Sequence, residues 1–297
     1  MSEYQYYEFQ AVDHRLGERE MQELRSFSTR ARITPTSFTN EYEWGSFKGN
    51  PNAWMEKYFD GYLYLANWGT REVQLAVPAK VLPAKTARPY CCSEAASSRE
   101  KSGKLILKFL TDEEPDGEWV EGEGNLSPLL QIRNELANGD IRSLYLGWLL
   151  AVQAGELPDE EEEPPVPPNL DALSGPQANF ADFFRLDPDL IAVAAQNCPR
   201  TGVQVPKRQE LSSWITALPS PEKDKIILRL MTGEEMKIGM ELQSRFRRQH
   251  DANDAPAGTK RRTVGELLAS AEERLRERQQ EQARKVRSKN SLGNKSK

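Results

Sequence analysis

The chain has 297 residues, of which 38% are hydrophobic, and its formal net charge is -5. This length suits one large domain or two modest ones, and the limited apolar content favours folded blocks separated by solvated segments. The sequence contains no apolar run of about 18 residues, which excludes an ordinary transmembrane helix. The N-terminal sequence MSEYQYYEFQ lacks the basic and apolar regions of a secretory signal, so we expect a cytoplasmic protein without membrane contact.

Elements expected in the N-terminal part alternate between strands and helices. Residues 4–12 are aromatic-rich and typical of a strand, residues 16–27 have the apolar spacing of a helix, and residues 32–47 are expected to be extended. Asn50 and Pro51 form a cap-and-proline start for a helix that we expect to reach about Ala66.

The next segment, TREVQLAVP, alternates Val73, Leu75 and Val77 and predicts another strand. The resulting order, β-α-β-α-β, predicts an α+β N-terminal domain with helices packed on a mixed sheet.

The middle of the chain combines a strand, a helical hairpin and a linker. Residues 79–103 are expected to form a surface loop, and KLILKFL at residues 104–110 predicts a strand. Residues 126–155 are typical of two helices separated at Asn138-Gly139. ELPDEEEEPPVPPNL has five consecutive acidic residues followed by four prolines in five positions, which indicates an extended, solvated linker.

Beyond the linker the sequence predicts a mostly α-helical region. Thr263 and Glu266 have the spacing of a capping box and predict the start of a charged helix, followed by a disordered SKNSLGNKSK tail. The expected organisation is residues 1–155, an α+β domain; 156–176, an acidic Pro-rich linker; 177–250, a small helical domain; and 251–297, a loop, a charged protruding helix and a disordered basic tail.

Four segments resemble a family of uncharacterised bacterial proteins: YEFQAVDHRL, STRARITPTSF, FKGNPNAWMEKYFDGYLYLANWGT and RRTVGELLASAEERLRER. The resemblance covers most of the chain. It implies an origin in the bacterial cytosol and an arginine-rich helix that continues further in related proteins, but it implies no activity.

Residues suited to catalysis or metal binding are scarce. Cys91, Cys92 and Cys198 have no zinc-ligand spacing and are expected to be free thiols, and neither His14 nor His250 stands in a recognisable catalytic motif. The chain also lacks the glycine-rich phosphate-binding loop G-x-x-x-x-G-K-[ST]. We therefore predict no catalytic, cofactor-binding or metal-binding residues, and favour a non-enzymatic protein over an enzyme whose site is assembled from scattered side chains.

Aromatic and arginine residues flank the predicted helix at residues 50–66, and apolar residues form a narrow seam on the last helix. Such residues are frequent interface anchors, although they also satisfy turns or face solvent. The residues predicted to contact another protein are Trp44, Lys48, Trp68, Arg71, Leu268 and Leu275.

The C-terminal region is basic while the rest is acidic. From Ser244 onward there are fifteen Lys and Arg against seven Asp and Glu, whereas the remainder has 25 against 38. Arginine clusters neutralise phosphates, but interleaved glutamates are equally typical of a solvated or helix-pairing surface. The residues predicted to contact nucleic acid are Arg245, Arg247, Arg248, Arg261 and Arg262.

The absence of a catalytic constellation, together with opposite charge on the two regions, favours a protein-interaction or adaptor role. Another protein is then the expected partner, in a larger assembly of the bacterial cytosol. The alternative is an accessory factor that binds nucleic acid through the basic C-terminal region.

Overall fold

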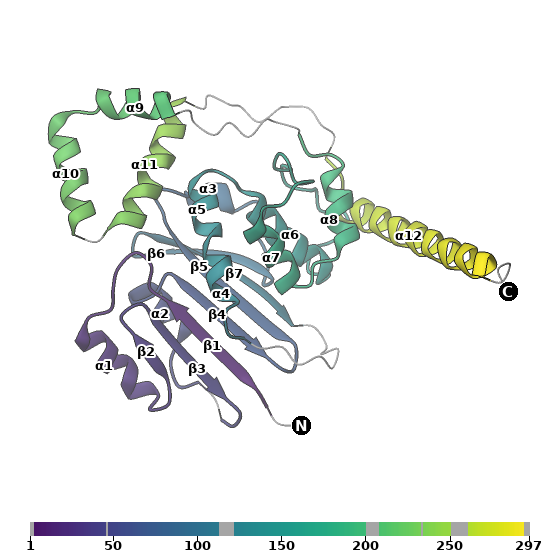
Figure 1. The fold of residues 1–297 in the computed structure, drawn as a ribbon, viewed down its shortest axis with the longest axis horizontal. Helices are drawn as coiled ribbons and strands as arrows, with labels where there is room; N and C mark the ends of the chain where they lie inside the picture. The colour runs from purple at the N-terminus through teal and green to yellow at the C-terminus, as the bar shows by residue number, and fades with distance from the viewer. Residues whose placement is uncertain are drawn as a thin grey trace.

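The computed structural model describes residues 3–45, 47–112, 122–199, 208–232, 234–250 and 261–293, and its architecture is α+β (Figure 1). One seven-stranded sheet has the order β2-β3-β1-β4-β5-β7-β6. The strands are β1 (Gln5–Gln10), β2 (Arg32–Thr34), β3 (Ser37–Tyr42), β4 (Gly61–Ala66), β5 (Thr70–Pro78), β6 (Ala96–Lys101) and β7 (Lys104–Asp112).

Three helices lie between the strands and the others follow β7, and the described ones include none long and apolar enough to cross a membrane. They are α1 (Glu18–Phe27), α2 (Pro51–Lys57), α3 (Ala84–Ala87), α4 (Leu126–Leu130), α5 (Ile132–Ala137), α6 (Arg142–Gln153), α7 (Gly175–Phe183), α8 (Pro188–Ala195), α9 (Arg208–Ala217), α10 (Ser220–Met231), α11 (Glu235–His250) and α12 (Val264–Gly293).

The expected β-α-β-α-β order with helices on a mixed sheet is wrong. All pairings between the described strands are antiparallel, so the sheet is not mixed. The helix expected to reach Ala66 ends at Lys57, and the following residues form β4 between β1 and β5. The segment expected to be a loop at residues 79–103 contains α3 and β6.

Burial on both faces explains why β4 resembled a helix. Leu63 and Leu65 belong to one hydrophobic cluster and Tyr62 to another, on the opposite face of the sheet. A strand with only one buried face alternates apolar and polar residues, whereas a strand covered on both sides is an unbroken apolar run. Periodicity alone cannot separate such a run from a buried helix.

Two apolar layers therefore enclose the sheet. On one face α1 and α2 cover an aromatic cluster in which the ring of Phe9 lies 5.1 Å from Trp54, and Trp54 lies 4.9 Å from Phe38. On the other face a larger cluster joins residues of β4, β5 and β7 to α4–α8, with Trp148 of α6 buried within it. Most aromatics of the segment from Trp54 to Tyr64 are thus core residues.

Predicted helix boundaries that depend on local hydrogen bonds are confirmed. The Asn50 side chain accepts the N–H of Ala53 at 3.1 Å and caps α2. Gly139, with φ of 72°, separates α5 from α6. Thr263 and Glu266 bond reciprocally at the start of α12, as in a capping box.

A buried charge cluster closes one end of the sheet. Asp60 is fully buried, and its carboxylate accepts the N–H groups of Val12 and Asp13 and a bond from Lys104 Nζ, each at 2.8 Å. Arg133 of α5 is also buried and pairs with Asp13 at 2.8 Å. Burial opposes ionisation of Asp60, but the charges of Arg133 and Lys104 and the Asp13 amide outweigh it, so the pKa of Asp60 lies below its ordinary value.

The segment expected to be a solvated linker carries buried contacts. Glu163 is buried, accepts a hydrogen bond from Tyr145 and pairs with Arg262 at 2.7 Å. Leu170 lies in the larger hydrophobic cluster. These contacts connect residues 156–176 with both α6 and the start of α12, while the proposed domain boundaries stay a prediction.

The last helix is held by a buried carboxylate on α8. Asp189 pairs with Arg274 at 3.3 Å and with Arg278 at 2.8 Å, one helical turn apart on α12. Beyond these contacts α12 projects away from the body (Figure 1, yellow) and continues to Gly293, into the segment expected to be a disordered tail. Residues 251–260 and 294–297 lie outside the described residues.

We expect the Asp60→Asn substitution to destabilise the fold by about 3 kcal/mol at neutral pH, because Lys104 and Arg133 would lose a buried counter-charge. Since the pKa of Asp60 is lowered on folding, its contribution is complete above the pKa of an unfolded aspartate and is lost as the pH falls through the folded value. Urea denaturation between neutral and acidic pH measures both effects. The exposed Asp224→Asn is the control and should leave stability unchanged.

Candidate functional site

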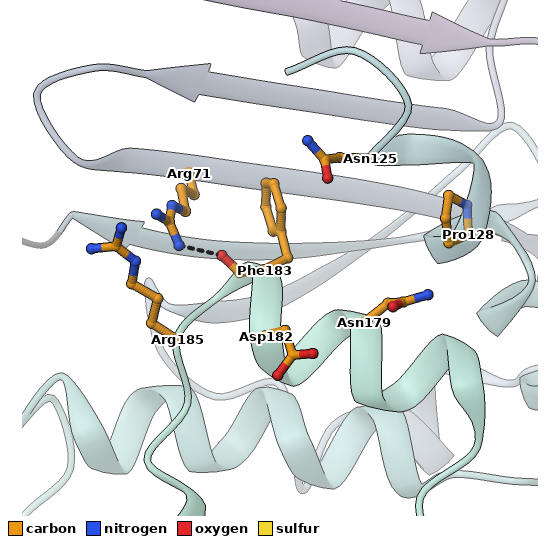
Figure 2. Close-up of a pocket in the computed structure, with 7 residues that line it drawn as sticks. All are labelled: Arg71, Asn125, Pro128, Asn179, Asp182, Phe183 and Arg185. Carbon is orange, nitrogen blue, oxygen red and sulfur yellow. Dashed lines mark hydrogen bonds between the residues drawn. The ribbon is translucent and has the colours of Figure 1, made fainter. Parts of the chain in front are cut away.

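A hollow of about 340 Å³ lies where β5 begins, beside α4 and α7 (Figure 2). Its polar walls come from segments far apart in the sequence. Its lining residues are Arg71, Asn125, Pro128, Asn179, Asp182, Phe183 and Arg185.

Arg71 organises this hollow. Only 8% of the residue is exposed, its Nη1 donates to the carbonyl oxygen of Phe183, and its guanidinium lies 5.8 Å from the Phe183 ring. Figure 2 shows Arg185 at the same end of the hollow as Arg71. Arg185 has a φ of 52°, a left-handed conformation that is unusual for a non-glycine residue. Two guanidinium groups, two carboxamides and the Asp182 carboxylate suit recognition of polar, hydrogen-bonding groups.

The residues predicted to contact a protein around the aromatic block do not line one groove. Strand register places Trp44 and Trp68 past the same end of the sheet, because Gln5 of β1 faces the ends of both β3 and β4. Trp44 is 78% exposed, Trp68 is 40% exposed and Lys48 is exposed, whereas Arg71 is buried. Of these residues, Arg71 alone lines the hollow described above.

The apolar seam predicted on the last helix is occupied in part by the chain itself. Val264, Leu267 and Ala271 of α12 are buried in the larger cluster, and Leu268 packs against it half-buried. Leu275 is half-buried. The first part of the seam therefore packs against the chain itself, including α8.

The described arginines of the predicted nucleic-acid surface each face a carboxylate. Arg245 pairs with Glu222 and lies over the Trp214 ring. Arg261 lies 3.9 Å from Glu162. Arg262 pairs with Glu163, as noted above, and also donates to two backbone carbonyls of α8. The side chains of Arg247 and Arg248 lie outside the described residues.

An exposed apolar surface on α9 and α10 was missed by the sequence analysis. Five large hydrophobic residues have exposed fractions between 38% and 81%. They are Ile215, Ile227, Leu228, Leu230 and Met231, and we call the four on α10 the α10 apolar face. The helical spacing of KIILRLM was visible in the sequence, but a buried and an exposed helix face have the same spacing.

Metal binding has no support in the described part of the chain, which brings together no group of three or more potential His, Cys, Asp or Glu ligands. No family model matches the chain, and no curated protein or solved structure matches it either. The resemblance to uncharacterised bacterial proteins stays a prediction.

We expect Arg71→Ala to destabilise the protein by about 2 kcal/mol, because the substitution removes a buried guanidinium and the charged hydrogen bond that it donates to the Phe183 carbonyl oxygen. Chemical denaturation measures the change. Lys48→Ala is the control, because it removes an exposed cation that precedes the aromatic-rich segment at residues 50–66, and it should leave the stability unchanged. Equal stability of the two variants would show that Arg71 does not hold α7 against the sheet.

Proposed function

We propose that this protein is a non-enzymatic interaction or adaptor protein, an accessory subunit of an assembly in the bacterial cytosol. The observation that supports this role is the α10 apolar face. Ile227, Leu228 and Met231 recur at three- and four-residue spacing, so they form one stripe along the helix. Burying a side chain of this size contributes about 1.5–3 kcal/mol, and monomeric proteins seldom expose several together.

Polar contacts hold α10 in place without covering this face. Arg229 pairs with Glu234 at 2.8 Å and with Glu241 at 2.9 Å, which joins α10 to the start of α11. Arg245 of α11 pairs with Glu222 near the other end of α10. The stripe is thus presented by a helix that is fixed at both ends.

Helix α11 in turn anchors α9 and α10 to the body of the protein. Ser244 donates to the Val81 carbonyl oxygen, Met240 is buried in the larger cluster, and Ile238 and Phe246 are also buried. Figure 1 shows α9 and α10 extending from this attachment. A fixed apolar stripe of this kind fits the apolar face of a helix in a partner protein.

The nucleic-acid alternative has less support. Arg245, Arg261 and Arg262 each have an acidic neighbour, which lowers the positive potential that phosphate binding requires.

The double substitution Leu228→Glu with Met231→Glu tests the proposal. Both side chains are exposed, at 63% and 81%, so we expect little change in the free energy of unfolding. Partner capture from a bacterial lysate, followed by mass spectrometry under stringent washing, should lose the proteins that the unmodified chain retains. Charges placed in the centre of an apolar contact would remain unpaired when it forms.

Lys225→Glu is the matched control, because it changes an exposed charge on the same helix without altering the stripe. It should retain the same partner. If the double variant and the unmodified chain capture identical proteins, the α10 apolar face is not the contact surface. Light scattering on the purified chain separates a different partner from self-association.

A further inference from the structure

A second hollow, of about 320 Å³, lies over the buried charge cluster at the end of the sheet. Asp13 and His14 reach it from the segment after β1, Ser102 and Lys104 from the β6–β7 turn, and Glu234 from the segment between α10 and α11. Its volume is at the lower end of the range of small-molecule sites. The hollow is distinct from the α10 apolar face and from the hollow at Arg71.

Lys104 is held in a fixed position at this hollow. Its Nζ donates to Asp60 Oδ1 at 2.8 Å and to the Phe59 carbonyl oxygen at 3.2 Å, and its side chain is 20% exposed. An ammonium group has three N–H donors. The third finds no acceptor among the described residues. A prepositioned donor of this kind loses little entropy when it binds a ligand.

The other accessible polar groups can also donate. Within the described part of the chain, neither the His14 imidazole nor the Ser102 hydroxyl makes a hydrogen bond. The orphan acceptor in the lining, Asp13 Oδ1, is fully covered by protein atoms and cannot reach a ligand. The reachable groups therefore favour a ligand that accepts hydrogen bonds.

The charges around the hollow restrict the ligand further. Arg133 compensates Asp13, and Arg229 compensates Glu234. Asp60 compensates the charge of Lys104, but it accepts only one of the three N–H groups of the ammonium. Three carboxylates and three cations therefore balance around the hollow, so a ligand with one negative charge meets less repulsion than a phosphate dianion.

We propose that this hollow binds a small monocarboxylate. One carboxylate oxygen accepts the third N–H of Lys104, and the His14 imidazole and Ser102 hydroxyl donate to the remaining lone pairs. The cluster of Asp60 and Arg133 serves as the rigid support that fixes the lysine. This adds a small-molecule site to the proposed interaction protein, and it does not depend on the α10 apolar face.

The experiment is an NMR titration of the full chain with sodium acetate and with sodium pyruvate in a carboxylate-free buffer. The chain has only two histidines, so the ring signals of His14 are assigned by their loss in His14→Gln. We expect either probe to shift the His14 signals saturably at millimolar concentration, while the His250 signals do not follow the same curve.

Lys104→Gln should weaken binding by about tenfold or more, because it removes the charged donor. Lys101→Gln is the matched control, since Lys101 is an exposed lysine on the same hairpin, and it should leave the affinity unchanged. Glu234→Gln does not touch Asp60, and it should strengthen binding by about twofold by removing a repelling charge. This variant keeps the test valid if Lys104→Gln fails to fold.

The proposal is overturned if neither probe produces a saturable shift of the His14 signals. It is also overturned if Lys104→Gln titrates like the unmodified chain, or if Glu234→Gln weakens binding.

Discussion

The buried carboxylate of Asp60 is the constraint on which the rest of the structure depends. It joins the segment after β1 to the start of β4 and β7, and through Asp13 it reaches Arg133 of α5. Four buried or half-buried charges are costly unless each is paired, and here each of the four has a partner of opposite charge. The strands that this cluster connects, β1, β4 and β7, contribute residues to both apolar clusters.

Enclosing the sheet uses most of the large apolar side chains, and this determines where function can lie. The aromatic cluster around Phe9 and Trp54 is closed to ligands, because its rings contact one another. The largest group of exposed apolar side chains among the described residues is the α10 apolar face, whose members belong to neither cluster, while Trp44, Trp68 and Ile215 are also exposed. The same charge cluster that closes the sheet also presents Lys104 to a hollow.

Several arginines of the basic C-terminal region form ion pairs with carboxylates of the same chain. Glu163 lies in the acidic run and binds Arg262, and Asp189 binds Arg274 and Arg278. Opposite net charge on the two regions thus serves in part to hold them together. An excess of basic residues in a sequence is therefore weak support for a phosphate partner when acidic residues elsewhere can reach it.

Features that depend on neighbours a few positions away could be predicted from the sequence by itself: the cap at Asn50, the break at Gly139 and the capping box of Thr263, together with the strands β1 and β7. Only the tertiary structure decided that β4 is a strand, that Arg71 is buried and that the α10 apolar face is exposed. Local hydrogen bonds are encoded within one turn of chain, whereas burial is decided by residues far away in sequence. An apolar stripe in the sequence marks one apolar face of a helix. Whether the same chain buries that face becomes known only from the folded structure.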